Sequence, residues 1–421
     1  MEQRATETSR AFLDVERSIS GQRWTQRLDQ AGLNQALAIA QSLGLSELVA
    51  RVMAGRGVTQ AEAEDFLDPT LKRLMPDPST LTDMDHAAER LAGAVIARDR
   101  VAIFGDYDVD GACSSALMKR FLDHFGIESE IYIPDRIFEG YGPNVAAINE
   151  LIDRGNRLIV TVDCGSTSHD ALAAAAARGI DVVVLDHHQV GSELPPSTAL
   201  VNPNREDDLS GLGHLCAAGV VFLTLVATLR VLRRHQQPGH ATLDLLELLD
   251  LVALATVCDV VPLKGLNRAY VVKGLIAARQ LSNPGLAALV KVVGIGGPIT
   301  PYHFGFVIGP RINAGGRIGD AALGSRLLTL EDPIEADAVA ARLDMLNRER
   351  QALETAMLEE AEAEALAEYA GGSGPAVFLT AREGWHPGIV GLIASRRPRH
   401  APFVYRLGRQ IFILERGVRL P

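Results

Sequence analysis

The chain has 421 residues, of which 47% are hydrophobic and 5% aromatic, and its formal net charge is −11. This length is too great for one ordinary core, so two or three domains are expected. The acidic balance disfavours a uniformly basic surface that coats nucleic acid, although a local basic groove remains compatible with it. The most apolar stretch, residues 217–232, is shorter than a membrane span, so it is predicted to be a buried helix and no membrane partner is expected.

The cysteines are few and scattered, and the N-terminus lacks the apolar core of a signal peptide. No CxxC pair occurs among Cys113, Cys164, Cys216 and Cys258. This spacing argues against a disulfide framework and against a structural zinc site. A reducing, cytoplasmic setting is therefore expected.

Residues 1–80 are predicted to form an N-terminal extension with a small set of helices. The apolar spacing is helical from Leu33 to Gly55, with a break at Gly44. Thr59 and Glu62 have the spacing of a capping box. No catalytic constellation appears in this part.

Residues 101–117 (VAIFGDYDVDGACSSAL) read as a buried strand, an acidic turn and a helix. The turn carries Asp106, Asp108 and Asp110. Three carboxylates so close together repel one another unless a cation neutralises them, which favours a divalent metal site. The alternative is a solvated acidic loop in which Asp106 or Asp110 caps the helix. These residues alone support both interpretations equally.

Later segments decide between the two interpretations. One β-branched strand ends at Asp163, the next ends in Asp186, His187 and His188, and Asp259 follows a predicted helix over 241–257. Strands that alternate with helices predict a doubly wound, mostly parallel α/β sheet within residues 81–325, and the strands' carboxyl ends share one edge. The carboxylates and a histidine would converge there as a two-metal phosphodiesterase site requires. Mixed Asp and His ligands suit two divalent cations, Mn²⁺ or Mg²⁺, with Mn²⁺ favoured.

The C-terminal part begins with a glycine-rich stretch, residues 300–320, that reads as a loop carrying Arg311 and Arg317. A long helix within residues 326–372 is predicted to connect the first α/β domain to a second. The segment AVFLTA followed by GWHPGIVGLIASR indicates a partial second α/β domain over residues 373–421.

The motifs GDYDVDG, VDCG, LDHH and CDVVPL resemble those of the DHH phosphoesterase superfamily. The flanking segments FLDPTLKRLMPDP, IPDRIFEGYG, FGPRINAGGRIGD and WHPGIVGLIASR resemble the RecJ family of single-stranded-DNA-specific exonucleases, over residues 30–396. The resemblance implies a DHH domain joined to a DHHA1 domain. It also implies a 5′→3′ exonuclease of DNA repair and recombination that acts as a monomer on single-stranded DNA, with single-strand-binding protein and a helicase as partners.

The resemblance implies roles for individual residues. Asp108 and Asp110 would each hold one metal, Asp163 would bridge both, and His188 would face the scissile phosphate. The remaining ligands would be Asp106 at the first metal and His187 with Asp259 at the second. Many relatives have a histidine where this chain has Phe104, which implies a weaker first metal.

Four further residues are candidates for nucleic-acid binding. Arg136, Arg311 and Arg317 would neutralise backbone phosphates, and His386 would contact substrate in the second domain. The alternatives are ordinary ion pairs for the arginines and a helix cap for His386.

After Ser395 the likeness to the family stops, and the tail becomes rich in arginine without lysine. The resemblance implies a C-terminally truncated or frame-shifted product whose tail is not a native fold and whose grip on DNA is reduced. Two other functions remain open. They are a DHH phosphodiesterase for short oligonucleotides or cyclic dinucleotides, and a truncated, inactive DNA-binding protein.

Overall fold

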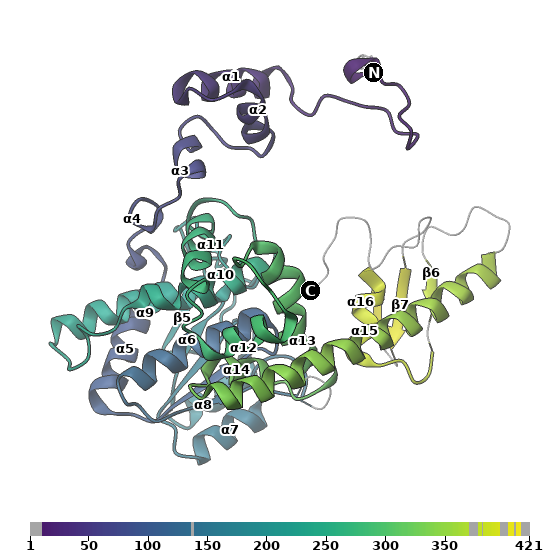
Figure 1. Ribbon diagram of the computed structural model, residues 1–421. Helices are drawn as coiled ribbons and strands as arrows, with labels where there is room; N and C mark the ends of the chain where they lie inside the picture. The colour runs from purple at the N-terminus through teal and green to yellow at the C-terminus, as the bar shows by residue number, and fades with distance from the viewer. Residues whose placement is uncertain are drawn as a thin grey trace, which may run out of the picture. The chain divides into compact units, whose positions relative to one another are not determined.

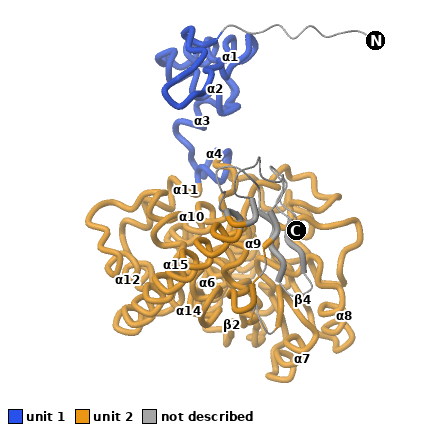
Figure 2. The backbone as a smooth tube through the Cα atoms, turned by 90° about the vertical axis from the view of Figure 1, so that its right-hand side faces the viewer, with its two compact units in different colours: residues 1–74, 264–269 blue, residues 75–263, 270–421 orange. Residues whose placement is uncertain are grey.

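The computed structural model describes residues 11–135, 139–369, 378–380, 382–395, 403–407 and 410–413. The chain divides into two compact units (Figure 2). The first comprises residues 1–74 and 264–269, and the second comprises residues 75–263 and 270–421. No helix among the described residues is both long enough and apolar enough to cross a membrane.

The first unit is a small helical assembly. Its apolar core joins α1 and α2 through Ala36, Ile39, Ala50 and Met53. The predicted break at Gly44 is confirmed, because this glycine ends α1 with a φ of 63°, where a side chain would be strained. Thr59 and Glu62 exchange the hydrogen bonds of a capping box, as predicted. The helices are η1 (Phe12–Asp14), α1 (Gln30–Leu43), α2 (Glu47–Gly55), α3 (Ala63–Leu67) and α4 (Leu71–Leu74).

The second unit is built on a five-stranded sheet whose strands are all parallel, with the order β2-β1-β3-β4-β5. The predicted mostly parallel α/β fold is confirmed. The three central strands are almost entirely buried, which is why they read as continuous apolar runs. The strands are β1 (Val101–Gly105), β2 (Ser129–Tyr132), β3 (Leu158–Val162), β4 (Asp181–Leu185) and β5 (Ala199–Val201).

Helices cover both faces of this sheet (Figure 1). Residues of α7 (Val145–Asp153) and α8 (His169–Ala177) share one core cluster with Phe104, Ile159 and Val184. The other helices that contact the strands are α5 (Met84–Ala97), α6 (Val109–His124) and α9 (Ala217–Arg234). Helix α9 contains the apolar stretch 217–232, and its buried residues confirm the prediction of a buried helix.

The glycine-rich stretch 300–320 was expected to be a loop, and this expectation is wrong. It forms a π-helix, η4 (His303–Ile308), that continues into α13 (Gly309–Ile318). The glycines permit close packing rather than turns. A methyl group on Gly309 would lie 2.5 Å from Cys258 Sγ, and one on Gly316 would lie 2.7 Å from the Tyr107 ring.

The remaining helices follow in chain order, and α11 begins in the segment 264–269 that belongs to the first unit. The predicted helix 241–257 is shorter than expected, because its regular part is α10 (Leu249–Cys258), preceded by the 3₁₀ turn η3 (Leu245–Leu248). The others are η2 (Pro78–Thr80), α11 (Gly265–Ala278), α12 (Pro284–Val293) and α14 (Leu323–Thr329).

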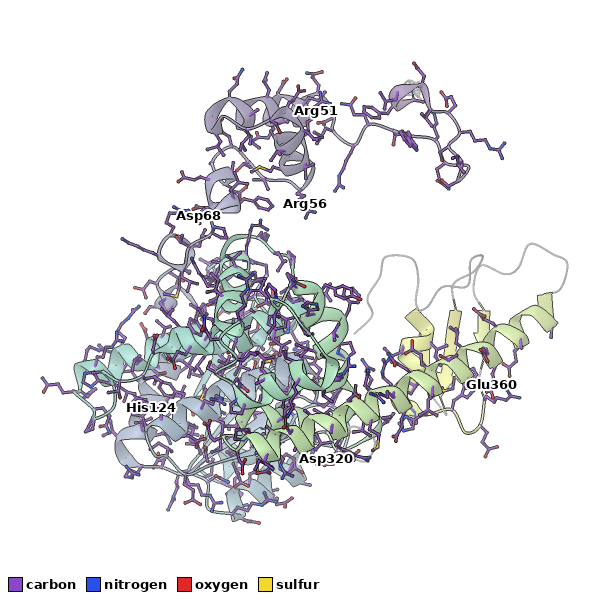
Figure 3. All side chains as sticks on the ribbon, in the orientation of Figure 1. Arg51, Arg56, Asp68, His124, Asp320 and Glu360 are labelled. Atoms are coloured by element: carbon purple, nitrogen blue, oxygen red, sulfur yellow. The ribbon has the colours of Figure 1, made fainter. Side chains whose placement is uncertain are left out.

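The long helix α15 (Pro333–Tyr369) packs against α12 and α13 and extends to a second, smaller sheet (Figure 1). Near its far end, Glu360 accepts a hydrogen bond of 2.8 Å from the Trp385 indole (Figure 3). Trp385 and α16 (Pro387–Ser395) form an apolar cluster with Met357 and Ala361 of α15.

The second sheet has the order β6-β7-β8, comprising β6 (Phe378–Thr380), β7 (Phe403–Leu407) and β8 (Gln410–Ile413). The tail after Ser395 was expected not to be a native fold. In its described part, β7 pairs in parallel with β6 and antiparallel with β8, and the expectation stays a prediction.

Candidate metal centre

The candidate centre lies at the carboxyl ends of β1, β3 and β4. In a sheet of order 2-1-3-4-5, the chain leaves β1 toward one side and β3 toward the other, which opens a crevice between them. The acidic turn follows β1, Asp163 follows β3, and Asp186, His187 and His188 follow β4. Asp163 has a φ of 60°, an uncommon conformation for a residue with a side chain, and such conformations cluster at functional sites.

The acidic turn is held by two helix N-termini. Asp108 Oδ1 accepts from the backbone N–H groups of Asp110 and Gly111, so the helix cap is Asp108 rather than Asp106 or Asp110. The Asp110 carboxylate accepts from Ala217 N at 2.6 Å and Ala218 N at 2.8 Å, at the start of α9. The partial positive charge of both helix ends therefore stabilises carboxylates in this turn.

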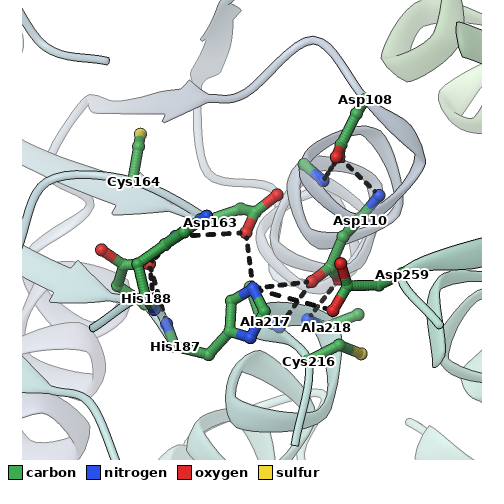
Figure 4. A network of polar contacts seen from close by, with 12 residues as sticks. Asp108, Asp110, Asp163, Cys164, His187, His188, Cys216, Ala217, Ala218 and Asp259 are labelled. Atoms are coloured by element: carbon green, nitrogen blue, oxygen red, sulfur yellow. Dashed lines mark hydrogen bonds and ion pairs between the residues drawn. The ribbon is translucent and has the colours of Figure 1, made fainter. Parts of the chain in front are cut away.

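His187 lies between carboxylates from three segments (Figure 4). Its Nε2 is 3.3 Å from Asp163 Oδ1, 3.7 Å from Asp110 Oδ2 and 3.8 Å from Asp259 Oδ2. Asp259 reaches this position because it is the residue directly after α10. Residues from distant parts of the sequence thus meet at one imidazole.

Three overlapping groups of side chains have ligand atoms that lie within 4.8 Å of one another. Asp163 belongs to two of these groups, and so does His187. All six predicted ligands belong to at least one group, together with His188. The groups are Asp163–His187–His188, Asp110–His187–Asp259 and Asp106–Asp108–Asp163.

Burial and repulsion between carboxylates raise the pKa values of Asp110, Asp163 and Asp259. Burial, followed by repulsion from Asp110, Asp108 and Asp106, raises the pKa of Asp163 well above its usual value. Burial also raises the pKa of Asp110, and with repulsion from Asp110 it raises that of Asp259 to about 7. These carboxylates are unstable as a group of anions, which is the electrostatic condition that a bound cation relieves.

The residues fit a pair of divalent cations. Asp163 Oδ1 is buried and accepts no hydrogen bond among the described residues, and it belongs to the shared part of the cluster. A donor set of carboxylate oxygens and an imidazole nitrogen suits Mn²⁺. Two neighbouring cation sites that share a carboxylate are the arrangement of two-metal hydrolases.

His188 is held by Asp186, a contact that the sequence analysis did not assign to any role. His188 Nδ1 lies 2.7 Å from Asp186 Oδ1, and this hydrogen bond raises the pKa of His188 to about 9 despite the opposing effect of burial. Burial would raise the pKa of Asp186, but His188 and the Ser166 N–H lower it below its usual value. An ionised carboxylate therefore fixes a protonated imidazole that is still 47% exposed.

Other polar residues, which no sequence motif identified, form hydrogen bonds to the residues around the metal centre. Tyr141 Oη donates to the Asp163 carbonyl oxygen at 3.3 Å and lies 3.3 Å from His188 Nε2. Asn202 Nδ2 donates to Ser166 Oγ and to the His188 carbonyl oxygen. Asn313 Oδ1 accepts from Val109 N at the start of α6. The tyrosine in EGYGPN was a signal that could have been found, whereas the asparagine contacts depend on the tertiary fold.

The described residues among the predicted nucleic-acid contacts each have partners within the chain. Arg311 is engaged with Asp344 of α15 at 2.9 Å and with the Val307 carbonyl oxygen, as the ion-pair alternative predicts. Arg317 Nη1 donates to the Gly388 carbonyl oxygen at 3.3 Å. His386 Nδ1 accepts from Gly388 N at the start of α16, as the capping alternative predicts. Arg136 lies outside the described residues.

Comparisons with known proteins agree with this geometry. Residues 100–256 match the DHH family, N-terminal domain. A Bacillus subtilis (strain 168) protein described as single-stranded-DNA-specific exonuclease RecJ is 36% identical over 381 residues, which cover 90% of this chain. A crystal structure of exonuclease RecJ bound to manganese is 35% identical with a TM-score of 0.67, and the match covers 77% of this chain and 80% of that chain. The chain belongs to the RecJ family.

A second RecJ structure, from Thermus thermophilus and in complex with Mn²⁺, is 32% identical with a TM-score of 0.73. That match covers 89% of this chain and 52% of that chain. The Bacillus subtilis match covers 46% of the relative's length, so this chain spans about half of that curated RecJ protein.

Proposed function

We propose that this chain is a metal-dependent exonuclease that hydrolyses phosphodiester bonds of single-stranded DNA in the 5′→3′ direction. The observation that carries the proposal is the meeting of Asp110, Asp163 and Asp259 at His187 Nε2. The assignment is supported by membership of the RecJ family and by the manganese and magnesium bound in related RecJ structures.

The ligand assignment follows the overlapping groups. Asp106 and Asp108 would hold one cation, Asp110, His187 and Asp259 would hold the other, and Asp163 would be shared. Bound cations of this kind lower the pKa of water and neutralise charge that develops on a phosphodiester. Phe104 is fully buried at the end of β1 and supplies no ligand atom, so the first cation would be held by oxygen atoms alone.

The second part of the proposed mechanism belongs to His188. Its imidazole is protonated at neutral pH, because its pKa is raised to about 9 by the hydrogen bond to Asp186. A half-exposed imidazolium at this position attracts a phosphate oxygen and keeps a proton at His188 Nε2 available for the departing oxygen. Asp186 accepts from His188 Nδ1 and fixes the ring, so that the second N–H of the imidazolium, at Nε2, is the one directed to the substrate.

The proposal extends to the wider setting. We propose a role in DNA repair and recombination, action as a monomer in the cytoplasm, and partnership with single-strand-binding protein and a helicase. The cytoplasmic location is supported by the four cysteines, all of which are free thiols. Residues 81–325 would be the catalytic DHH domain, residues 326–372 the connector, and residues 373–421 a partial DHHA1 domain that, with Arg136, Arg311, Arg317 and His386, would contact DNA.

The test is release of nucleotides from a 5′-phosphorylated single strand with Mn²⁺, compared between the wild type and Asp163→Asn. We expect the substitution to lower the rate by at least about 10³-fold, because both cations lose a shared ligand. Asp170→Asn, an exposed acid on α8, is the matched control and should leave the rate unchanged.

Three outcomes contradict the proposal. Equal release by the wild type and Asp163→Asn would remove the two-metal mechanism. Faster cleavage of a cyclic dinucleotide than of the single strand would favour the small-substrate phosphodiesterase. Binding of the strand without release by the wild type would favour the inactive DNA-binding protein.

A further inference from the structure

Two aromatic rings stand exposed on the π-helix η4 and the turn before it. The Tyr302 and Phe306 rings stack with centroids 5.3 Å apart and an interplanar angle of 25°. Tyr302 is 63% exposed and Phe306 is 74% exposed, the two highest values among aromatic residues whose side chains the structure describes. Adjacent exposed apolar side chains are a feature of interaction sites.

The conformation of η4 places these rings together. Residues four positions apart lie on the same face of a helix, so Phe306 lies beside Tyr302. π-helical turns are rare and occur frequently at functional sites. His303 Nδ1 accepts from Thr300 N and fixes the start of the segment.

The π-helix packs directly on the segment that delivers Asp259 to the metal centre. Cys258 Sγ donates to the Phe304 carbonyl oxygen at 3.3 Å. A methyl group on Gly305 would lie 3.4 Å from Val257 Cγ1. The stacked pair is thus fixed to the residues that immediately precede a proposed metal ligand.

The third most exposed aromatic residue among those whose side chains are described also borders the centre. Tyr141 is 56% exposed, and its hydroxyl contacts both Asp163 and His188. Tyr141 therefore borders the cluster at the β3 and β4 ends, whereas Tyr302 and Phe306 stand on the helix packed beside Asp259. The three most exposed Phe, Trp or Tyr residues whose side chains the structure describes thus lie on segments that contact the candidate centre or the residues directly before Asp259.

We propose that Tyr302 and Phe306 form a stacking platform for unpaired bases of a single-stranded nucleic acid whose backbone reaches the metal centre. The inference rests on the proposed function and deepens it. Every base has a flat π-face that stacks on an aromatic ring without regard to sequence, and in a duplex these faces are covered by neighbouring base pairs. The platform would therefore favour single strands over duplexes and contribute little to discrimination between bases.

The platform is tested by binding, separately from cleavage. In an Asp163→Asn background with EDTA, fluorescence anisotropy of a labelled single strand of about 12 nucleotides, long enough to fill one binding groove, measures the Kd. We expect Phe306→Ala to raise this Kd about tenfold, Phe306→Leu to fail to restore it, and Phe306→Trp to restore it, because only an aromatic ring stacks on a base. Ile334→Ala, which removes a side chain 81% exposed on α15, is the control and should leave Kd unchanged.

A second measurement uses cleavage by the otherwise wild-type chain. Phe306→Ala should raise KM for a normal strand about tenfold with kcat changed less than about twofold, and it should have no effect on a strand whose nucleotides are all abasic. Equal Kd and KM for the wild type and Phe306→Ala would overturn the platform while leaving the nuclease proposal intact. Absence of any metal-dependent cleavage by the wild type would overturn the proposed function, and the anisotropy series would still decide the platform. A wild-type dimer that Phe306→Ala converts to a monomer, measured by light scattering, would show that the rings pack between copies and would overturn the inference.

Discussion

The two ends of the five-stranded sheet both carry clustered acids, but they neutralise them differently. At the amino ends of the strands, Asp181 lies 2.6 Å from Arg90, and Glu130 lies 2.7 Å from Arg154. At the carboxyl ends, the ion pairs that the described residues provide to Asp110, Asp163 and Asp259 all come from His187 and His188. Arginines of the chain neutralise the acids at the amino ends. At the carboxyl ends, a bound cation would neutralise Asp110, Asp163 and Asp259.

The pKa values reflect this difference. Burial raises the pKa of Glu130, but hydrogen bonds from Asn156 and Arg154 outweigh it and lower the pKa below the usual value. Burial and repulsion raise the pKa of Asp163 instead. An acid with a lowered pKa stabilises the folded chain at neutral pH, whereas an acid with a raised pKa destabilises it until something positive binds.

Asp250 is a buried acid in the first turn of α10. Of the stability effects predicted in this comparison, the largest is expected from replacing this acid. Burial raises its pKa to about 6. Folding therefore favours its protonated form. The loss of folding stability that Asp250 causes is absent below about pH 4, grows between about pH 4 and 6, and stays constant above about pH 6. The change in the free energy of unfolding caused by Asp250→Asn should therefore be more stabilising at about pH 7.5 than at about pH 4. The difference between the two pH values should be about 2–3 kcal/mol.

Urea denaturation of the wild type and Asp250→Asn in EDTA, from about pH 4 to 7.5, measures this difference. Asp170→Asn, which replaces an exposed acid in the first turn of another helix, is the matched control for the substitution itself. A difference between wild type and Asp250→Asn that stays constant over this range would show that Asp250 titrates normally.

A smaller effect is expected at the amino end of the sheet. Arg90 pairs with both Asp181 and Asp99, and its side chain is only 18% exposed. Arg90→Met should lower the free energy of unfolding by about 1–2 kcal/mol, because two acids lose their shared cation. Urea denaturation measures it, and kcat and KM for nucleotide release should stay within about twofold of wild type.

Arg234→Met is the control for this prediction, because Arg234 is 64% exposed and its pair with Glu89 should contribute less than about 0.5 kcal/mol. A large loss of nuclease activity in Arg90→Met would contradict the separation of the two ends.

The sequence allowed prediction of the fold and of the acids at the strand ends, because both depend on local patterns. Apolar runs mark buried strands, and residues after parallel strands meet at one edge, so these patterns predict that Asp108, Asp163 and His187 lie close together. The family resemblance supplied their separate roles.

Tertiary packing decided what the sequence did not. Gly309 and Gly316 suggested a loop, yet they lie in a helix. Glycine is required at these two positions because Cys258 and Tyr107 leave no room for a Cβ atom. Arg311 pairs with Asp344 on a helix 33 residues later, a contact that no local pattern indicates. Asp186 and His188 are close in sequence, but the hydrogen bond that raises the pKa of His188 depends on how the fold orients the two side chains.

Titration of metal-free protein with Mn²⁺ tests the central claim most directly, with free Mn²⁺ followed by electron paramagnetic resonance. The geometry predicts two bound ions per wild-type chain and at least about tenfold weaker binding of both in Asp163→Asn, because both sites share that carboxylate. No binding by the wild type, or unchanged binding by Asp163→Asn, would contradict the account.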